Sequence, residues 1–197
     1  MPNRYSPISR LLAGLVFIWS ATSALAEDSL AIEFKSKLDA IVTAAATPDG
    51  GSALAEHIDY GAVTRGVIGK HGELLNNEQT AAFQRVFEQS MADLLQRATA
   101  TAGEFTSEIT KTLVSDKNPN RAQAVADIRM ENGQVLQIVA SMARGDNGWQ
   151  VRNLIFDGVN LGLTYRNQFS QLMRETENDA DLAIARWTEL TNKPANE

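Results

Sequence analysis

The segment from Gly148 to Phe169 constrains the fold of this chain more than any other, because its apolar period changes at Gly158 from that of a strand to that of a helix. Before Gly158 the side chains alternate, with Trp149, Val151, Ile155 and Asp157 on one face and Gln150, Arg152, Leu154 and Phe156 on the other. After Gly158, apolar residues recur every three or four positions, at Leu161, Tyr165, Phe169 and Leu172. The segment therefore predicts a strand, covered on both sides towards its end, that turns directly into an amphipathic helix.

Four antiparallel strands are predicted between Gly103 and Gly158. Turn-forming residues interrupt this stretch at 116–120, at Asn132-Gly133 and at 145–148. Asn132-Gly133 is typical of a two-residue hairpin turn, because both residues tolerate positive φ. The apolar faces of the second and third strands then consist of Ala122, Ala124, Ala126, Ile128 and Met130, and of Leu136, Ile138, Ala140 and Met142.

Helices are predicted on either side of these strands along the chain. An apolar stripe indicates a first helix from Asp28 to about Ala46, and a short second helix runs from an N-cap at Asp59 to Gly69. A long third helix begins at Asn76 or Asn77. Two more follow Gly158, at 161–174 and around Trp187. This order predicts a single α+β domain in which helices from both ends of the chain cover a four-stranded antiparallel sheet.

Small residues occupy the middle of the predicted apolar face. Alanine stands at positions 122, 124, 126 and 140, with bulkier side chains nearer the strand ends. Such a face either leaves room for a ligand or lets a covering helix pack closely. The spacing alone favours close packing.

Two segments of the chain resemble the MlaC family, also called the toluene-tolerance family. The main match comprises Gly148, Trp149, Val151, Gly158, Val159, Leu161, Tyr165, Arg166 and Phe169. A weaker match is IDYGAVTRGVIG at 58–69, followed by NNEQTAAFQRVF at 76–87. The chain departs from the family pattern at Asn153, Asn160 and Gly72, where the family usually has aspartate, serine and, in many members, tryptophan. It is identified as a divergent member.

The resemblance implies a periplasmic phospholipid carrier of a Gram-negative bacterium. MlaC-like proteins hold acyl chains in an apolar pocket between a curved sheet and its covering helices. They shuttle phospholipid between an outer-membrane lipoprotein complex and an inner-membrane ABC transporter, which maintains outer-membrane lipid asymmetry. Exposing tens of methylenes to water would cost on the order of 20 kcal/mol, so the pocket must be enclosed and transfer must occur at protein docking sites. We expect a monomer without cofactor or metal.

The resemblance also gives the alanine-lined face a ligand and predicts which side chains surround it. Arg166 is the headgroup candidate, since a guanidinium can hold a phosphate through two hydrogen bonds. Tyr165 and Arg166 differ by about 100° on a helix, so only one of them can face inward. A surface ion pair is the alternative role for Arg166. The predicted lipid-binding residues are Val63, Val67, Phe83, Phe87, Ile109, Ile128, Leu136, Ile138, Val151, Leu161, Tyr165 and Phe169.

Residues 1–26 are predicted to be a secretory signal peptide, and residues 27–197 the lipid-binding domain. Arg4 and Arg10 precede an apolar run at 11–19, and Ala24-Leu25-Ala26 has the small residues of a cleavage site. The apolar run is shorter than the roughly 20 residues that span a membrane. The chain has no cysteine, so we expect neither a disulfide nor a lipid-modified cysteine.

The charge of the chain argues against nucleic acid and against simple adsorption to a membrane. The predicted signal peptide contains two of the 18 basic residues and none of the 24 acidic ones, so the remainder has 16 basic and 24 acidic residues and a net charge of −8. Such a surface is weakly repelled by nucleic acid and by anionic bilayers. We therefore expect contact with membranes only through docking proteins.

The sequence contains little that could support catalysis. His57 and His71 lack the spacing of a metal site, and no serine lies in a G-x-S-x-G motif. We therefore predict that the protein is not an enzyme. Two alternatives stay open: a binder of another lipid such as a hopanoid, and an isomerase or dehydratase resembling nuclear transport factor. The enzyme would need a buried carboxylate such as Asp127 or Glu108, and the alternation points Asp127 outward.

Overall fold

The computed structural model describes residues 18–45, 47, 53–102, 104–145 and 148–191. Helix α1 (Ile18–Ala45) is followed by α3 (Tyr60–Ile68), the 3-10 helix η2 (Gly69–Glu73) and α4 (Asn77–Ala102). The strands are β1 (Phe105–Ser115), β2 (Asn118–Met130), β3 (Val135–Gly145), β4 (Gly148–Phe156) and β5 (Val159–Asn160). Helices α5 (Leu161–Glu175) and α6 (Ala180–Thr191) complete the described chain.

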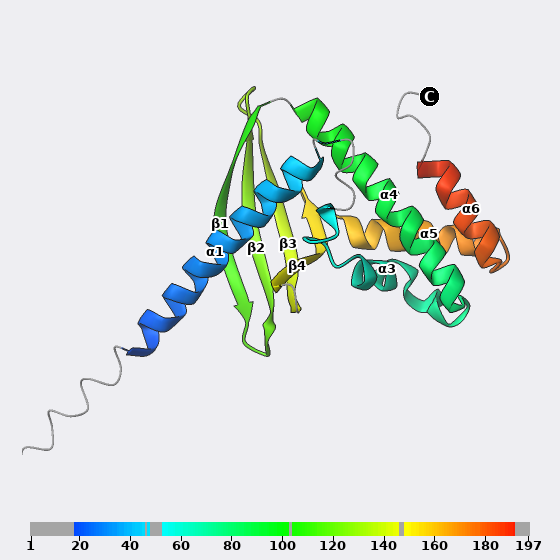
Figure 1. The fold of residues 1–197 in the computed structure, drawn as a ribbon, viewed down its shortest axis with the longest axis horizontal. Coiled ribbons are helices and arrows are strands. Elements are labelled where there is room, and N and C mark those ends of the chain that lie inside the picture. The colour runs from blue at the N-terminus through cyan, green and yellow to red at the C-terminus, as the bar shows by residue number, and fades with distance from the viewer. Residues whose placement is uncertain (1–17, 46, 48–52, 103, 146–147, 192–197) are drawn as a thin grey trace, which may run out of the picture.

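The strands form one antiparallel sheet in the order β1-β2-β3-β4-β5. The α+β prediction is confirmed. The structure has the four predicted strands and a fifth, β5, of only two residues at the edge of the sheet. Helix α1 lies across one face of the sheet, while α3, α4, α5 and α6 gather beside β4 (Figure 1). Helix α4 packs against both α1 and α6, so helices from the two ends of the chain meet on it.

The predicted helix caps are present. The Asp59 carboxylate accepts the backbone N–H of Ala62 at 2.9 Å, and α3 ends at Gly69 with φ of 55°. Asn76 rather than Asn77 caps α4, because Asn76 Oδ1 accepts from Gln79 N at 2.8 Å while the Gln79 side chain accepts from Asn76 N. These reciprocal bonds satisfy backbone donors that a helix start leaves without partners.

The hairpin between β2 and β3 is confirmed, but the prediction of a two-residue turn is wrong. The N–H of Gly133 donates to Met130 O, and the N–H of Met130 donates to Gln134 O. Gly133 has φ of 84°, while Asn132 keeps negative φ and accepts from Gln134 N through its side chain. A side-chain hydrogen bond to the backbone thus favours a longer turn than the dipeptide alone indicates.

The predicted alternation of β4 is correct up to Val151 and wrong beyond it. Met142 pairs with Val151 but Ser141 pairs with Asn153, so Arg152 is an extra residue in a β-bulge. The bulge moves Leu154 to the inner face, opposite Ala140, and moves Ile155 off that face. An inserted residue reverses the faces of every position that follows it.

The buried core lies between the inner face of the sheet and the helices. Helix α1 contributes Leu30, Phe34 and Leu38, with 4%, 3% and 9% of their surface exposed. From the sheet, Ala122, Ala124, Ala126 and Ile128 of β2 are joined by Ala140 and Met142 of β3. This face is the one predicted from the alternation of β2 and β3.

Candidate lipid and anion sites

Four predicted lipid-binding residues lie together in a packed aromatic cluster. Phe83 and Phe87 of α4 and Tyr165 and Phe169 of α5 surround Trp187 of α6, with ring centroids between 4.5 and 6.3 Å apart. Phe83, Phe87, Phe169 and Trp187 are exposed by 2% or less, so this aromatic cluster is solid core. Trp187, at its centre, was not among the predicted residues, although it shares the apolar face of the last predicted helix.

A second group of apolar residues is only half-buried and packs against the core from several elements. On the sheet, the cross-strand pairs Ile109–Ala126–Ile138, Ile128–Leu136 and Phe105–Met130 place these side chains on the same face as the buried alanines. We call this group the half-buried lining; it comprises Val86, Met91 and Leu95 of α4, Phe105, Ile109, Met130, Leu136, Ile138 and Leu154 of the sheet, and Tyr165 of α5.

Of the half-buried lining, sequence reasoning had identified Ile109, Leu136, Ile138 and Tyr165. Phe105, Met130 and Val86 were missed as site residues, and Leu154 was placed on the wrong face by the unrecognised bulge at Arg152. Burial raises the pKa of the Tyr165 phenol, so this side chain stays neutral in its apolar surroundings. The lining is thus apolar and uncharged.

The expectation of room directly above the alanines is wrong. Ala124, Ala126 and Ala140 are completely buried, and Ala122 is 5% exposed. Helix α1 packs against β1, and its Leu30, Phe34 and Leu38 belong to the same buried core as the alanines, so this part of the face is filled by protein. The half-buried lining keeps accessible surface on the same face, as do the more exposed Val114 and Phe156 towards the strand ends.

The other predicted wall residues are divided among different environments. Val67, Ile128 and Val151 are buried in the core, with 0%, 7% and 3% exposed. Val63 is half-buried on α3, and Leu161 is the half-buried first residue of α5. The structure therefore does not gather all of the predicted residues around one space.

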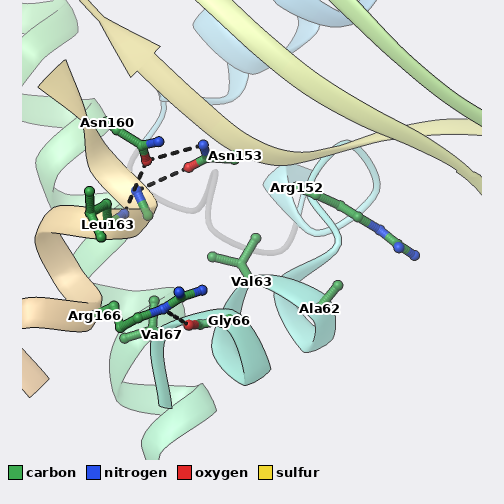
Figure 2. Close-up of a pocket in the computed structure, with 10 residues that line it drawn as sticks. Ala62, Val63, Gly66, Val67, Arg152, Asn153, Asn160, Leu163 and Arg166 are labelled. Carbon is green, nitrogen blue, oxygen red and sulfur yellow. Dashed lines mark hydrogen bonds between the residues drawn. The ribbon is translucent and has the colours of Figure 1, made fainter. Parts of the chain in front are cut away.

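A separate, partly polar pocket of about 310 Å³ opens between α3, β4 and α5 (Figure 2). Only Val63 and Val67 of the predicted apolar wall line it, together with the headgroup candidate Arg166. It is therefore distinct from the half-buried lining, and we call it the polar pocket. Its other lining residues are Ala62, Gly66, Arg152, Asn153, Asn160, Gly162 and Leu163.

Both ends of α3 are attached to neighbouring elements by an arginine. At the start, Arg152 of the β4 bulge donates to Asp59 Oδ2 from Nε at 2.9 Å and from a terminal nitrogen at 2.7 Å. At the other end, Arg166 Nε of α5 donates to Gly66 O at 2.7 Å, and its aliphatic stem lies 3.4 Å from where a Gly69 Cβ would be. A cation is favourable at a helix C-terminus, so Arg166 stabilises the α3–α5 contact.

The two departures Asn153 and Asn160 are hydrogen-bonded to each other in the wall of the polar pocket. Asn153 Nδ2 donates to Asn160 Oδ1 at 3.1 Å, and the same oxygen accepts from Leu163 N at 3.0 Å as the N-cap of α5. Asn153 Oδ1 accepts from Gly162 N at 3.0 Å. A Cβ at Gly162 would lie 2.4 Å from Asn153 Oδ1, so any larger residue there would displace the Asn153 amide from this bond.

Gly72, the third departure from the MlaC family pattern, opens no interior space. Gly72 is exposed in η2, and a Cβ built on it meets only Ile68, at 3.8 Å.

The two candidate carboxylates of an enzyme lie outside the core. Glu108 and Asp127 pair across β1 and β2 on the face opposite Ala126. Glu108 is exposed and Asp127 half-buried, so the predicted outward orientation of Asp127 is confirmed.

Comparison with known proteins identifies the family. The family model described as MlaC protein matches residues 44–189. This chain belongs to the MlaC family. Toluene tolerance protein ttg2D of Pseudomonas putida is 28% identical over 119 residues, which are 60% of this chain and 54% of that protein. The chain thus aligns with only about half the length of that relative.

A solved structure shares the fold of this MlaC-family chain. The phospholipid-binding protein from Ralstonia solanacearum, in complex with a phospholipid, superposes with a TM-score of 0.70. The similarity covers 83% of this chain and 98% of that one, at 17% identity. Within the described residues, the MlaC-family chain has no helix whose length and hydropathy would let it cross a bilayer.

Proposed function

We propose that this protein binds a glycerophospholipid through its acyl chains, which contact the half-buried lining. The observation that carries the proposal is the position of that lining: apolar, uncharged side chains that keep accessible surface on the inner face of the sheet. An acyl chain placed there would remove this surface from water, at about 0.8 kcal/mol per buried methylene. The phospholipid in complex with the Ralstonia protein, which shares this fold, and the MlaC family of this chain support the same ligand.

The protein then acts as a periplasmic carrier rather than as an enzyme. It collects phospholipid at an outer-membrane lipoprotein complex and delivers it to an inner-membrane ABC transporter, or moves it the other way, as a soluble monomer. Its net acidic charge disfavours direct adsorption to anionic membranes, which supports transfer at docking proteins. The predicted lipid-binding residues and the headgroup role of Arg166 are part of this proposal.

Export requires that residues 1–26 can be removed without loss of the fold. Helix α1 continues through this position, from Ile18 to Ala45. Its described buried side chains begin at Leu30 and include Phe34, Leu38 and Ala44, all beyond the predicted cleavage site. Cleavage after Ala26 would therefore keep every one of these contacts, and the mass of the protein recovered from a periplasmic fraction tests it.

Lipid extraction tests the proposed function directly. The protein is purified from a bacterial periplasm, extracted with organic solvent, and its phospholipid is quantified by phosphorus content and mass spectrometry. We expect close to one phospholipid per protein, because the lining is unfavourable in water. Protein that folds normally but carries no phospholipid, and takes up none from vesicles, would contradict the proposal.

A further inference from the structure

We propose that the polar pocket binds a phosphate-type anion, either the headgroup phosphate of a lipid or a free phosphate. The first source rests on the proposed function, while the second does not. The proposal is carried by what the lining residues can still offer to a ligand once their internal hydrogen bonds are counted.

Asn160, in the pocket wall, has one side-chain donor left after its internal hydrogen bonds are counted. The Oδ1 atoms of Asn153 and Asn160 already accept from the backbone of Gly162 and Leu163, which fixes the orientation of both amides. Asn160 Nδ2 makes no hydrogen bond within the described part of the chain. An amide nitrogen can only donate, so this wall favours a ligand rich in acceptors.

Arg166 adds a cation on the opposite wall. Its Nε is committed to Gly66 O, while its terminal nitrogens point into the space between α3 and β4 (Figure 2). Across the described ranges, no acidic side chain lies within ion-pair distance of Arg166. Two terminal nitrogens in one plane match the geometry of two phosphate oxygens.

The remaining charges of the pocket cancel. Arg152 also lines it, but its guanidinium is paired with the Asp59 carboxylate and extends away from the pocket centre in Figure 2. The pocket therefore has a net positive charge from Arg166, on a chain whose formal net charge is −6. A local positive charge on an acidic protein attracts an anion that the rest of the surface repels.

The size and the apolar part of the pocket restrict the ligand further. Its volume of about 310 Å³ suits a phosphate with a small organic group but not the acyl chains of a phospholipid. Ala62, Val63, Val67 and the half-exposed Leu163 form the apolar part of the wall. A phosphate ester of glycerol, polar at one end and less polar at the other, fits this division.

The decisive variant is Asn160→Asp. An aspartate at this position still accepts from Leu163 N and from Asn153 Nδ2, so the α5 cap is kept, and a negative charge at a helix start is favourable. The same change replaces the donor in the pocket wall by an anion. Gln123→Glu, at an exposed position on β2, is the matched control with the same change in net charge.

Binding to the purified, delipidated protein is measured by calorimetry with inorganic phosphate, glycerol phosphate, dihexanoylphosphatidylglycerol and dihexanoylglycerol. We expect Asn160→Asp to lower the affinity for the phosphate-bearing probes by about tenfold or more relative to dihexanoylglycerol. Gln123→Glu should leave this ratio unchanged. Binding of inorganic or glycerol phosphate to the wild type would identify a free-phosphate site, whereas a selective effect on the phosphatidylglycerol alone would identify a headgroup site.

The outcomes separate this inference from the proposed function. If both dihexanoyl lipids bind and Asn160→Asp affects them equally, the phospholipid carrier stands and the anion site is wrong. If neither lipid binds but inorganic phosphate does, and Asn160→Asp abolishes it, the anion site stands and the carrier is wrong. If no phosphate-bearing probe binds while the variant impairs only association with a partner protein, the pocket is a protein contact and the inference is overturned.

Discussion

The aromatic cluster and the half-buried lining are built from similar residues but differ in how much surface they keep. Phe83, Phe87, Phe169 and Trp187 are exposed by 2% or less, whereas Leu136, Ile138 and Met130 are only half-buried although they pack on the same core. Close packing in the first region leaves no place for a ligand. The comparison teaches that a binding surface here is identified by incomplete burial of apolar groups and not by their type.

The largest expected effect comes from emptying the centre of the aromatic cluster. Trp187→Ala should lower the free energy of unfolding by about 3–5 kcal/mol, because four rings lose their common neighbour. Urea denaturation measures it. Trp187→Phe should cost less than about 1.5 kcal/mol, since the buried Nε1 has no hydrogen-bond partner in the described part of the chain. A loss for Trp187→Ala no larger than for the exposed Leu190→Ala would show that the cluster is not solid core.

A smaller effect is expected at the buried alanines in the middle of the sheet. Ala124→Leu adds bulk at a completely buried position and should cost about 1–3 kcal/mol of unfolding free energy, measured in urea. The matched change Gln123→Leu lies on the exposed side of the same strand and should be close to neutral. A stable Ala124→Leu protein that has lost its phospholipid would place the ligand above the middle of the sheet after all.

Filling the half-buried lining should have a still smaller effect on stability but a large one on lipid. Ile138→Trp can extend into the accessible space, so we expect a cost below about 1 kcal/mol and a several-fold loss of co-purified phospholipid. Phosphorus content per protein and urea denaturation measure the two quantities. Val139→Trp, on the opposite face of β3, should keep its phospholipid. Destabilisation by Ile138→Trp as large as by Trp187→Ala would make the lining ordinary packed core.

The smallest expected effect is on how stability depends on pH, through His71 at the edge of the aromatic cluster. His71 contacts Phe169, and burial, followed by the nearby Lys70 and Arg174, lowers its pKa. The unfolded chain therefore binds a proton near pH 6.5 while the folded protein does not, so stability is lost as the pH falls below about 6.5. His71→Gln should reduce the difference between urea midpoints measured near pH 7.5 and near pH 5.5.

The control for this experiment is His57, whose pKa is lowered by burial, with Lys37 acting in the same direction and Glu56 opposing both. His57→Gln should also reduce the difference between the two urea midpoints, and independently of His71→Gln, because each histidine has its own lowered pKa. An unchanged pH dependence in His71→Gln would show that His71 takes up its proton equally in the folded and unfolded chains.

The elements were predictable because their signals are local. A carboxylate at Asp59, a glycine at Gly69 and an amide at Asn76 act within a few residues of themselves, and the helices begin and end there. The alternation of Ala122 to Met130 similarly fixed the inner face of β2. The prediction failed at Arg152 because a bulge depends on how β3 pairs with β4, which no local pattern of β4 contains.

The candidate sites were less predictable, since each depends on residues that meet only in three dimensions. The polar pocket combines Gly66, Asn153 and Arg166 from three elements, and of these three residues the sequence had given a ligand role only to Arg166. Phe83 and Ile138 follow equally regular apolar periods, yet one is completely buried and the other is not. Period reports which side of an element is apolar, but not how closely the next element approaches it.

By itself the sequence determined the class of fold, the order of elements, the caps and the inner face of the sheet, because backbone preferences and apolar periods are properties of short segments. Only the tertiary structure decided that Ala124 and Ala140 are completely buried, that Phe105, Met130 and Ile138 keep accessible surface, and that Asn160 and Arg166 line one pocket. These outcomes depend on packing distances between segments far apart in the chain, which are set by the whole core at once.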